Sequence, residues 1–165
     1  MNFDPLGYLT PTGKHTIPIA DFRSRFVEAF DQSSTRLEIF NGYIRYLNEL
    51  KGIIGNIAKL TQWIDGSFVT SKLNPGDIDL VSFLDNQIVE KYEDRLQALL
   101  SSEARKAYCV DGYVVRVYPQ YHPNHFRTIS DIAYWNDWFG RTKPNQNRKR
   151  YQKGYIEIKH ISSSP

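Results

Sequence analysis

The chain is poor in cysteine and has no long apolar segment. Cys109 is the only cysteine among the 165 residues, which excludes an internal disulfide and any zinc site that needs several cysteines. Because its neighbours are apolar, we expect Cys109 to be a small core residue rather than a nucleophile. No apolar run approaches the ~20 residues that a membrane-spanning helix needs, and the first residues lack the basic start and apolar stretch typical of secretion. We therefore expect a cytoplasmic protein without a membrane partner.

Charge of one sign is also scarce, since the formal net charge at pH 7 is only +3. Its distribution is more informative, because the segment between Trp138 and Tyr155 has six basic residues and no acidic one. The basic residues of this segment, called the basic loop below, are Arg141, Lys143, Arg148, Lys149, Arg150 and Lys153. The proline and asparagines among them are typical of a solvated, flexible loop. Such a cluster also attracts nucleic acid or a triphosphate, so both interpretations stay open.

The length and an ordinary apolar content predict one domain over residues 1–165 with a core of its own. Prolines and glycines indicate that residues 1–18 form an extended N-terminal arm. Apolar residues at helical spacing predict N-terminal helices over residues 19–52, the first of them capped by Asp21. The serine-rich tail, residues 162–165, is predicted to be disordered.

Alternation and β-branched residues predict strands in the rest of the chain, over residues 60–64, 78–83, 108–118 and 154–159. Helical spacing predicts a helix over residues 85–101, with Asp85 as its N-cap, and another over residues 130–139. The second helix carries an aromatic cluster of Trp135, Trp138 and Phe139. Such a cluster either packs in the core, which is the commoner case, or stacks on bases.

The most informative stretch is WIDGSFVTSKLNPGDIDL, residues 63–80. Asp77 and Asp79 are separated by one residue, so on a strand both side chains point to the same face. Two adjacent carboxylates repel each other unless a cation lies between them. The turn at Gly66 and Ser67 offers backbone N–H groups to an anion. The stretch therefore predicts a cation site beside a phosphate-binding turn, a combination suited to nucleotide chemistry.

Asp111 is the candidate for a third carboxylate. It is the only acidic residue of the strand expected over residues 108–118, where alternation places it on the same face as Tyr113 and Val115. Burying an isolated carboxylate is costly unless it is paired or bound to a metal. The alternative is an exposed residue at the start of the strand, with Gly112 marking a bulge. Asp65 either joins the same acidic group or faces solvent.

The stretch over residues 63–80 resembles the signature of the DNA polymerase beta-like nucleotidyltransferase superfamily. That signature is an apolar strand, then Gly-Ser, then about ten residues and then Asp-apolar-Asp-apolar. The match covers residues 64–80. Softer likenesses extend it to small, mostly uncharacterised bacterial proteins with a nucleotidyltransferase-like domain, through GYLTPTGKH at residues 7–15 and KGYIEI at residues 153–158. The resemblance implies an α+β fold of the nucleotidyltransferase type, with a small mixed sheet flanked by helices and a catalytic core over residues 60–118.

The resemblance also implies an enzyme that moves NMP from an NTP to a protein or RNA hydroxyl, within a toxin–antitoxin or phage-defence system. Two Mg²⁺ ions, or Mn²⁺ in their place, would be held by the catalytic residues Asp77, Asp79 and Asp111. The nucleotide would be held by Gly66, Ser67, Thr70 and Lys72. A loop lysine such as Lys72 is more often simply solvated.

Two features depart from better-known relatives in the superfamily. Minimal nucleotidyltransferases often carry an arginine two or three positions after Gly-Ser, where this chain has Val69 and Thr70. The chain also has no room for a large helical acceptor-binding domain. The alternative function is therefore a catalytically silent copy of the fold that binds a partner protein or nucleic acid, as an antitoxin or regulatory subunit. A distance above roughly 6 Å between Asp111 and the pair Asp77 and Asp79 would speak against two-metal chemistry.

Overall fold

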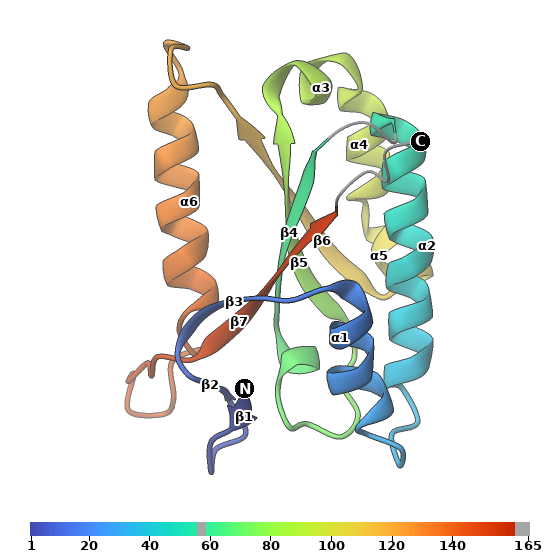
Figure 1. The fold of residues 1–165 in the computed structure, drawn as a ribbon, viewed down its shortest axis with the longest axis vertical. Helices are drawn as coiled ribbons and strands as arrows, with labels where there is room; N and C mark the ends of the chain where they lie inside the picture. The colour runs from blue at the N-terminus through green and yellow to red at the C-terminus, as the bar shows by residue number, and fades with distance from the viewer. Residues whose placement is uncertain (56–58, 161–165) are drawn as a thin grey trace.

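A computed structural model describes residues 1–55 and 59–160 (Figure 1). In this part of the chain the centre is a five-stranded mixed sheet in the order β3-β7-β4-β5-β6. The strands are β3 (Gly13–Thr16), β4 (Leu60–Asp65), β5 (Ile78–Asp85), β6 (Val110–Val117) and β7 (Gly154–His160). Strand β4 runs antiparallel to both of its neighbours, whereas β3 with β7 and β5 with β6 form parallel pairs. The expected α+β class with a mixed sheet is therefore confirmed.

Six α-helices lie within the described residues: α1 (Ile19–Arg23), α2 (Arg36–Ile54), α3 (Asn86–Lys91), α4 (Glu93–Leu99), α5 (Ser102–Tyr108) and α6 (His125–Phe139). A π-helical turn at Ser24–Glu28 continues α1, and a 3-10 turn at Ser67–Val69 follows β4. A hairpin of β1 (Asn2–Phe3) and β2 (Leu9–Thr10) precedes β3. Within the described ranges, no helix has the length and apolar character needed to cross a membrane.

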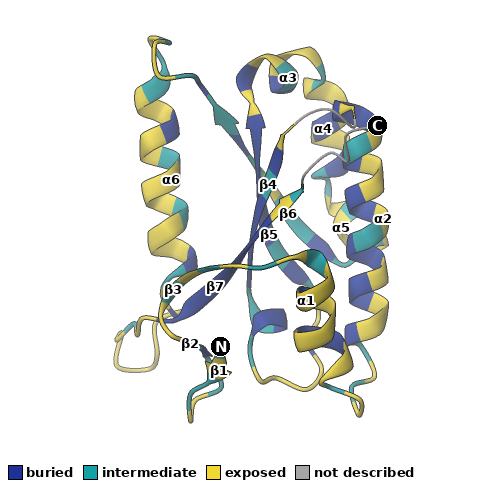
Figure 2. Cartoon of the chain, viewed as in Figure 1, coloured by how far each residue is buried: buried dark blue, intermediate teal, exposed yellow. Residues whose placement is uncertain are grey.

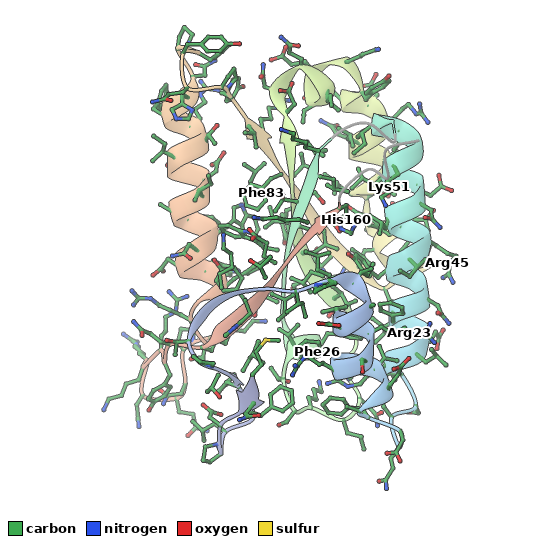
Figure 3. The ribbon with its side chains drawn as sticks, in the orientation of Figure 1. Arg23, Phe26, Arg45, Lys51, Phe83 and His160 are labelled. Atoms are coloured by element: carbon green, nitrogen blue, oxygen red, sulfur yellow. The ribbon has the colours of Figure 1, made fainter. Side chains whose placement is uncertain are left out.

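The two faces of the sheet support two cores. Helices α1, α2, α4 and α5 lie on one face and α6 lies on the other (Figure 1). The larger core, between the sheet and α2, includes the fully buried Tyr43, Leu50, Ile64 and Leu80. The smaller core lies under α6 and consists of Trp63, Val81, Phe83, Val115, Phe139 and Tyr155. Figure 3 labels Phe83 on the side of the sheet that faces α6.

The strands expected from alternation are all present, within one or two residues of the predicted bounds. The single helix expected over residues 85–101 is wrong, because the chain breaks at Tyr92, where φ is −120° and ψ is 25°. Glu93 and Asp94 lie in the first turn of α4, where the helix dipole favours acidic side chains and supports a new start. Asp85 is the N-cap of α3 and accepts a hydrogen bond from the Gln87 amide at 2.8 Å.

One expectation about a helix start is wrong, and one helix is missing from the expectations. Asp21 does not cap the first helix, since the cap position is Pro18 and Asp21 lies in the first turn. Helix α5 was not expected at all, although Ser101 caps it by accepting a hydrogen bond from the Ala104 amide at 3.1 Å. The extended arm of residues 1–18 also does more than lead into the domain. Its β3 pairs in parallel with β7 and forms an edge of the sheet. The tail at 162–165 lies outside the described residues.

Candidate active site

Three carboxylates stand in register across adjacent strands. Asp65 on β4 is the partner of Asp79 on β5, and Asp79 is the partner of Asp111 on β6. Residues paired in this way point to the same face, with backbones about 5 Å apart. Asp77 directly precedes β5. We call Asp65, Asp77, Asp79 and Asp111 the acidic row. It lies on the α6 face, because alternation places it with Trp63 and Val81 of the smaller core.

The crowding of negative charge is visible in the ionisation of Asp79. Burial raises the pKa of Asp79, and the neighbouring carboxylates of Asp77 and Asp111 raise it further. Lys143 and Arg105 lower it again, but the net direction is upward. A carboxylate whose charged form is disfavoured in this way gains most from a bound cation.

Gly66 is held directly against this carboxylate. Its φ is +80°, a conformation that favours glycine. A Cβ atom at this position would lie 1.8 Å from Oδ2 of Asp79, which no side chain can occupy without displacing the carboxylate. The Gly-Ser turn and Asp79 are therefore neighbours in space, as the proposed pairing of a phosphate turn with a cation site requires. Ser67 begins the 3-10 turn that follows.

Asp65 and Lys153 form a buried ion pair at the end of the row. The Lys153 ammonium also donates a hydrogen bond to the Phe139 carbonyl at 2.8 Å, so it connects β4 to the end of α6. Burial raises the pKa of Asp65 to about 6, although Lys153 and the Gly66 amide act in the opposite direction. The expectation that Lys153 serves as an exposed nucleic-acid contact is therefore wrong. Its charge is needed inside the protein.

Arg105, on the unexpected helix α5, lies between two members of the row. It donates a hydrogen bond to Oδ2 of Asp77 at 2.6 Å and pairs with Oδ2 of Asp111 at 2.9 Å. Because one guanidinium contacts both carboxylates, the structure brings Asp111 and Asp77 together, with Asp79 beside them. Arg105 is half exposed, and exposed ion pairs of this kind contribute only about 0–1 kcal/mol to stability.

The donor set suits a hard divalent cation, since Mg²⁺ and Mn²⁺ prefer carboxylate oxygens. Within the described ranges, no three carboxylate, imidazole or thiol groups are already arranged around one ion position. The guanidinium of Arg105 instead holds two of the three carboxylates. The residues therefore fit Mg²⁺ by chemistry and by register, provided that Arg105 moves aside.

The residues expected to bind the nucleotide are placed less uniformly. Gly66 and Ser67 lie at the acidic row. The Thr70 hydroxyl donates to the Ser67 carbonyl at 2.7 Å and accepts from the Lys72 amide at 3.2 Å, so it shapes the loop. The exposed Lys72 side chain forms no hydrogen bond or ion pair with another described residue. The structure thus brings the Gly-Ser turn to the carboxylates, while Thr70 has an internal role.

Sequence reasoning missed Arg36, which holds the loop after the Gly-Ser turn. Its side chain is fully buried, and its five N–H groups all donate to backbone carbonyls, at distances of 2.6–3.3 Å. The acceptors are Phe26, Phe68, Thr70, Lys72 and Leu73. Burial lowers the pKa of Arg36 to about 10. One signal was available: a cation in the first turn of a helix opposes the helix dipole unless it is bound elsewhere.

The aromatic cluster of α6 divides between core and surface. Phe139 is buried in the smaller core, and Trp135 is half-buried, 4.9 Å from the Tyr113 ring. Trp138 is half exposed and stacks on Tyr134, with ring centres 6.0 Å apart and planes 12° apart. The core interpretation therefore holds for Phe139 and in part for Trp135, which packs against the smaller core, but not for Trp138.

The chain was compared with known families, curated proteins and solved structures. The profile of a family of unknown function (DUF6932) matches residues 1–159. No curated protein matches the chain. No solved structure matches it either.

Proposed function

We propose that this chain, which belongs to the family of unknown function DUF6932, is a Mg²⁺-dependent nucleotidyltransferase that moves NMP from an NTP to a hydroxyl group. The observation that carries the proposal is the acidic row: Asp79 and Asp111 are strand partners, Asp77 shares a guanidinium with Asp111, and Gly66 touches Asp79. A nucleotidyltransferase-type fold is part of the proposal. It is supported by an antiparallel pair, β4 and β5, that carries both halves of the signature beside a parallel third strand.

In this proposal Asp77, Asp79 and Asp111 hold Mg²⁺, or Mn²⁺ in its place. Ions bound there would supply neutralisation of phosphate charge and a lower pKa of the attacking hydroxyl. Backbone N–H groups of the Gly66–Ser67 turn and the Ser67 hydroxyl bind the triphosphate. A bond forms between the acceptor oxygen and the α-phosphorus while the bond to pyrophosphate breaks. Asp111, which lies on the edge strand β6, is the member of the row that receives the proton of the hydroxyl in this proposal.

Arg105 supplies what the loop lacks. The arginine that minimal nucleotidyltransferases often carry shortly after Gly-Ser is absent here, but Arg105 of α5 lies at the acidic row, paired with Asp77 and Asp111. Its half-exposed side chain is free to leave them once cations bind. It then lies within reach of the triphosphate, whose bidentate oxygens suit a guanidinium.

The proposal is tested by incubating the pure protein with each α-labelled NTP, Mg²⁺ and a cell extract. We expect label from at least one NTP to become covalently attached to an acceptor, and the D77A/D79A variant to lose this transfer. The matched control is Asp85→Asn, which removes a carboxylate from the other end of β5 and retains a residue able to cap α3. Absence of transfer with every NTP, or equal transfer by D77A/D79A, would refute the proposal.

The ion pairs of Arg105 support a second candidate function, a catalytically silent module that binds a partner. In that case Arg105 is the permanent counter-ion of Asp77 and Asp111. The R105A variant then loses thermal stability, and millimolar Mg²⁺ restores none of it. If the row is a cation site, Mg²⁺ raises the melting temperature of R105A more than that of the wild type, because the ion replaces the missing charge.

A further inference from the structure

Next to the acidic row, a series of aromatic side chains is left exposed. Tyr113, Tyr134 and Trp138 are 43%, 55% and 50% exposed. Figure 2 shows that most of α6 is exposed, whereas the strands β4, β5 and β7 of the sheet are largely buried. Large aromatic side chains contribute most when buried, so three exposed ones beside a candidate active site indicate a binding surface.

The rings form one continuous series, which we call the aromatic strip: Tyr113, Trp135, Tyr134 and Trp138. Ring centres of successive members are 4.9, 5.3 and 6.0 Å apart. Tyr113 follows Asp111 by two residues on β6, so the two side chains share a face and lie about 7 Å apart. The strip therefore begins at the acidic row and runs outward along the last turns of α6.

Positive charge flanks the outer end of the strip. The basic loop leaves the end of α6 on the same side of the molecule (Figure 1). Without the buried Lys153 it has five cations. Asp137 pairs with two of them, Arg141 and Arg150, and Lys143 lies close enough to Asp79 to lower the pKa of that carboxyl. The Arg150 guanidinium also lies 5.8 Å from the centre of a Trp138 ring. Lys143, Arg148 and Lys149 form no ion pair within the described ranges.

Exposed rings flanked by cations match single-stranded nucleic acid. Bases stack on aromatic faces irrespective of sequence, while Lys and Arg contact the phosphates between them. A duplex offers no free base faces to such a strip. The centre of a protein–protein interface is typically apolar and poor in charged residues. The cations beside the strip therefore favour nucleic acid over a protein partner.

We propose that the aromatic strip and the basic loop bind a single strand of nucleic acid and direct its terminal hydroxyl to Asp111. This inference rests on the proposed nucleotidyl transfer and narrows its acceptor to a nucleic-acid end. Bases stack along Tyr134 and Trp138, the phosphates lie against Arg148 and Lys149, and the last nucleoside reaches Tyr113.

The test is fluorescence anisotropy with end-labelled oligonucleotides of 12 bases as single-stranded RNA, single-stranded DNA and RNA duplex. We expect a single strand to bind more tightly than the duplex, and the RNA and DNA arms identify the sugar. Trp138→Ala should weaken binding about tenfold, the loss of one stacked base. The control is Phe126→Ala, which removes another exposed aromatic about 18 Å away along α6 and should leave binding unchanged.

Equal binding of duplex and single strand, or equal effects of W138A and F126A, would overturn the inference. The R148A/K149A variant provides a second measure and should flatten the dependence of affinity on salt, because phosphate contacts are lost. Binding and chemistry can fail separately. A strand that binds but is never extended with any NTP contradicts the transfer reaction alone. Label that passes to a protein of the extract, with no strand bound, contradicts the nucleic-acid acceptor alone.

Discussion

Removing the guanidinium of Arg36 should cost this protein an unusually large part of its stability. The side chain is fully buried at the start of α2. Its five donors contact carbonyls in two separate segments, at Phe26 and over residues 68–73. It also lies 3.7 Å from the Phe30 ring centre and 5.1 Å from that of Phe68. No carboxylate pairs with it within the described ranges, so backbone dipoles alone balance its charge.

The size of the effect follows from counting the contacts. Five hydrogen bonds at about 1 kcal/mol each contribute about 5 kcal/mol to the free energy of unfolding. The charge of the donors raises this contribution. In the variant, water that enters the loop and binds the freed carbonyls reduces the loss. We therefore expect Arg36→Met to lose about 3–5 kcal/mol of unfolding free energy, a large share of the ~5–15 kcal/mol of a typical domain. Arg36→Lys keeps the charge but has three donors on one atom, so it should lose about 2–3 kcal/mol.

Urea denaturation measures both losses as shifts of the midpoint at unchanged slope. Arg45→Met is the matched control, because Arg45 lies on the outer side of the same helix (Figure 3) and makes one hydrogen bond, to the Ala107 carbonyl at 3.2 Å. It should change stability by no more than about 0.5 kcal/mol. If Arg36→Met is as mild as this control, the loop after the Gly-Ser turn does not depend on Arg36, and the reasoning is refuted. If Arg36→Met fails to fold, the Lys variant supplies the measurement.

Further predictions concern the acidic row. Gly66→Ala should abolish transfer and lower the melting temperature, because its Cβ would displace the Asp79 carboxylate; wild-type kinetics would contradict the close approach. The pKa of Asp65 is about 6 in the folded protein, above the ordinary value of 3.8. The folded state therefore binds this proton more tightly than the unfolded chain does. As a result, the contribution of Asp65 to stability falls as the pH rises from 3.8 to about 6. The Lys153→Met variant should raise the pKa of Asp65 further. The loss of unfolding free energy that this variant shows in urea denaturation should therefore be larger at pH 8 than at pH 5. A larger loss at pH 5 would contradict the buried pair. Asp79→Asn should abolish transfer. In EDTA at pH 8 it should also raise the melting temperature by about 3 °C, because it removes one of three mutually repelling charges. A lower melting temperature would mean that Asp79 has a structural role instead.

The acidic row was predictable from the sequence because alternation is a local rule. Once residues 60–64, 78–83 and 108–118 are recognised as strands, the alternation of side chains places Asp79 on the same face as Asp77 and Val81. The register that makes Asp65, Asp79 and Asp111 strand partners is a tertiary property, and only the structure supplies it.

The charges that surround the row were not predictable, because their partners lie far away in the sequence. Arg105 meets Asp77 across 28 residues and Lys153 meets Asp65 across 88. Neither pair leaves a periodic pattern. The same holds for β3, whose short Gly-Lys-His-Thr stretch has weak strand propensity and is fixed by pairing with β7. Lys153 also shows why charge clusters mislead: it resembles its solvated neighbours in sequence but points inward.

The central claim is that the acidic row is a divalent-cation site, and titration calorimetry with Mn²⁺ tests it most directly. The wild type and D85N should bind the ion, whereas D79N and D111N should lose binding. R105A should bind about tenfold more tightly, because no guanidinium has to be displaced from Asp77 and Asp111. Equal binding by wild type, D79N and D111N, or no binding by wild type and R105A alike, would contradict the account.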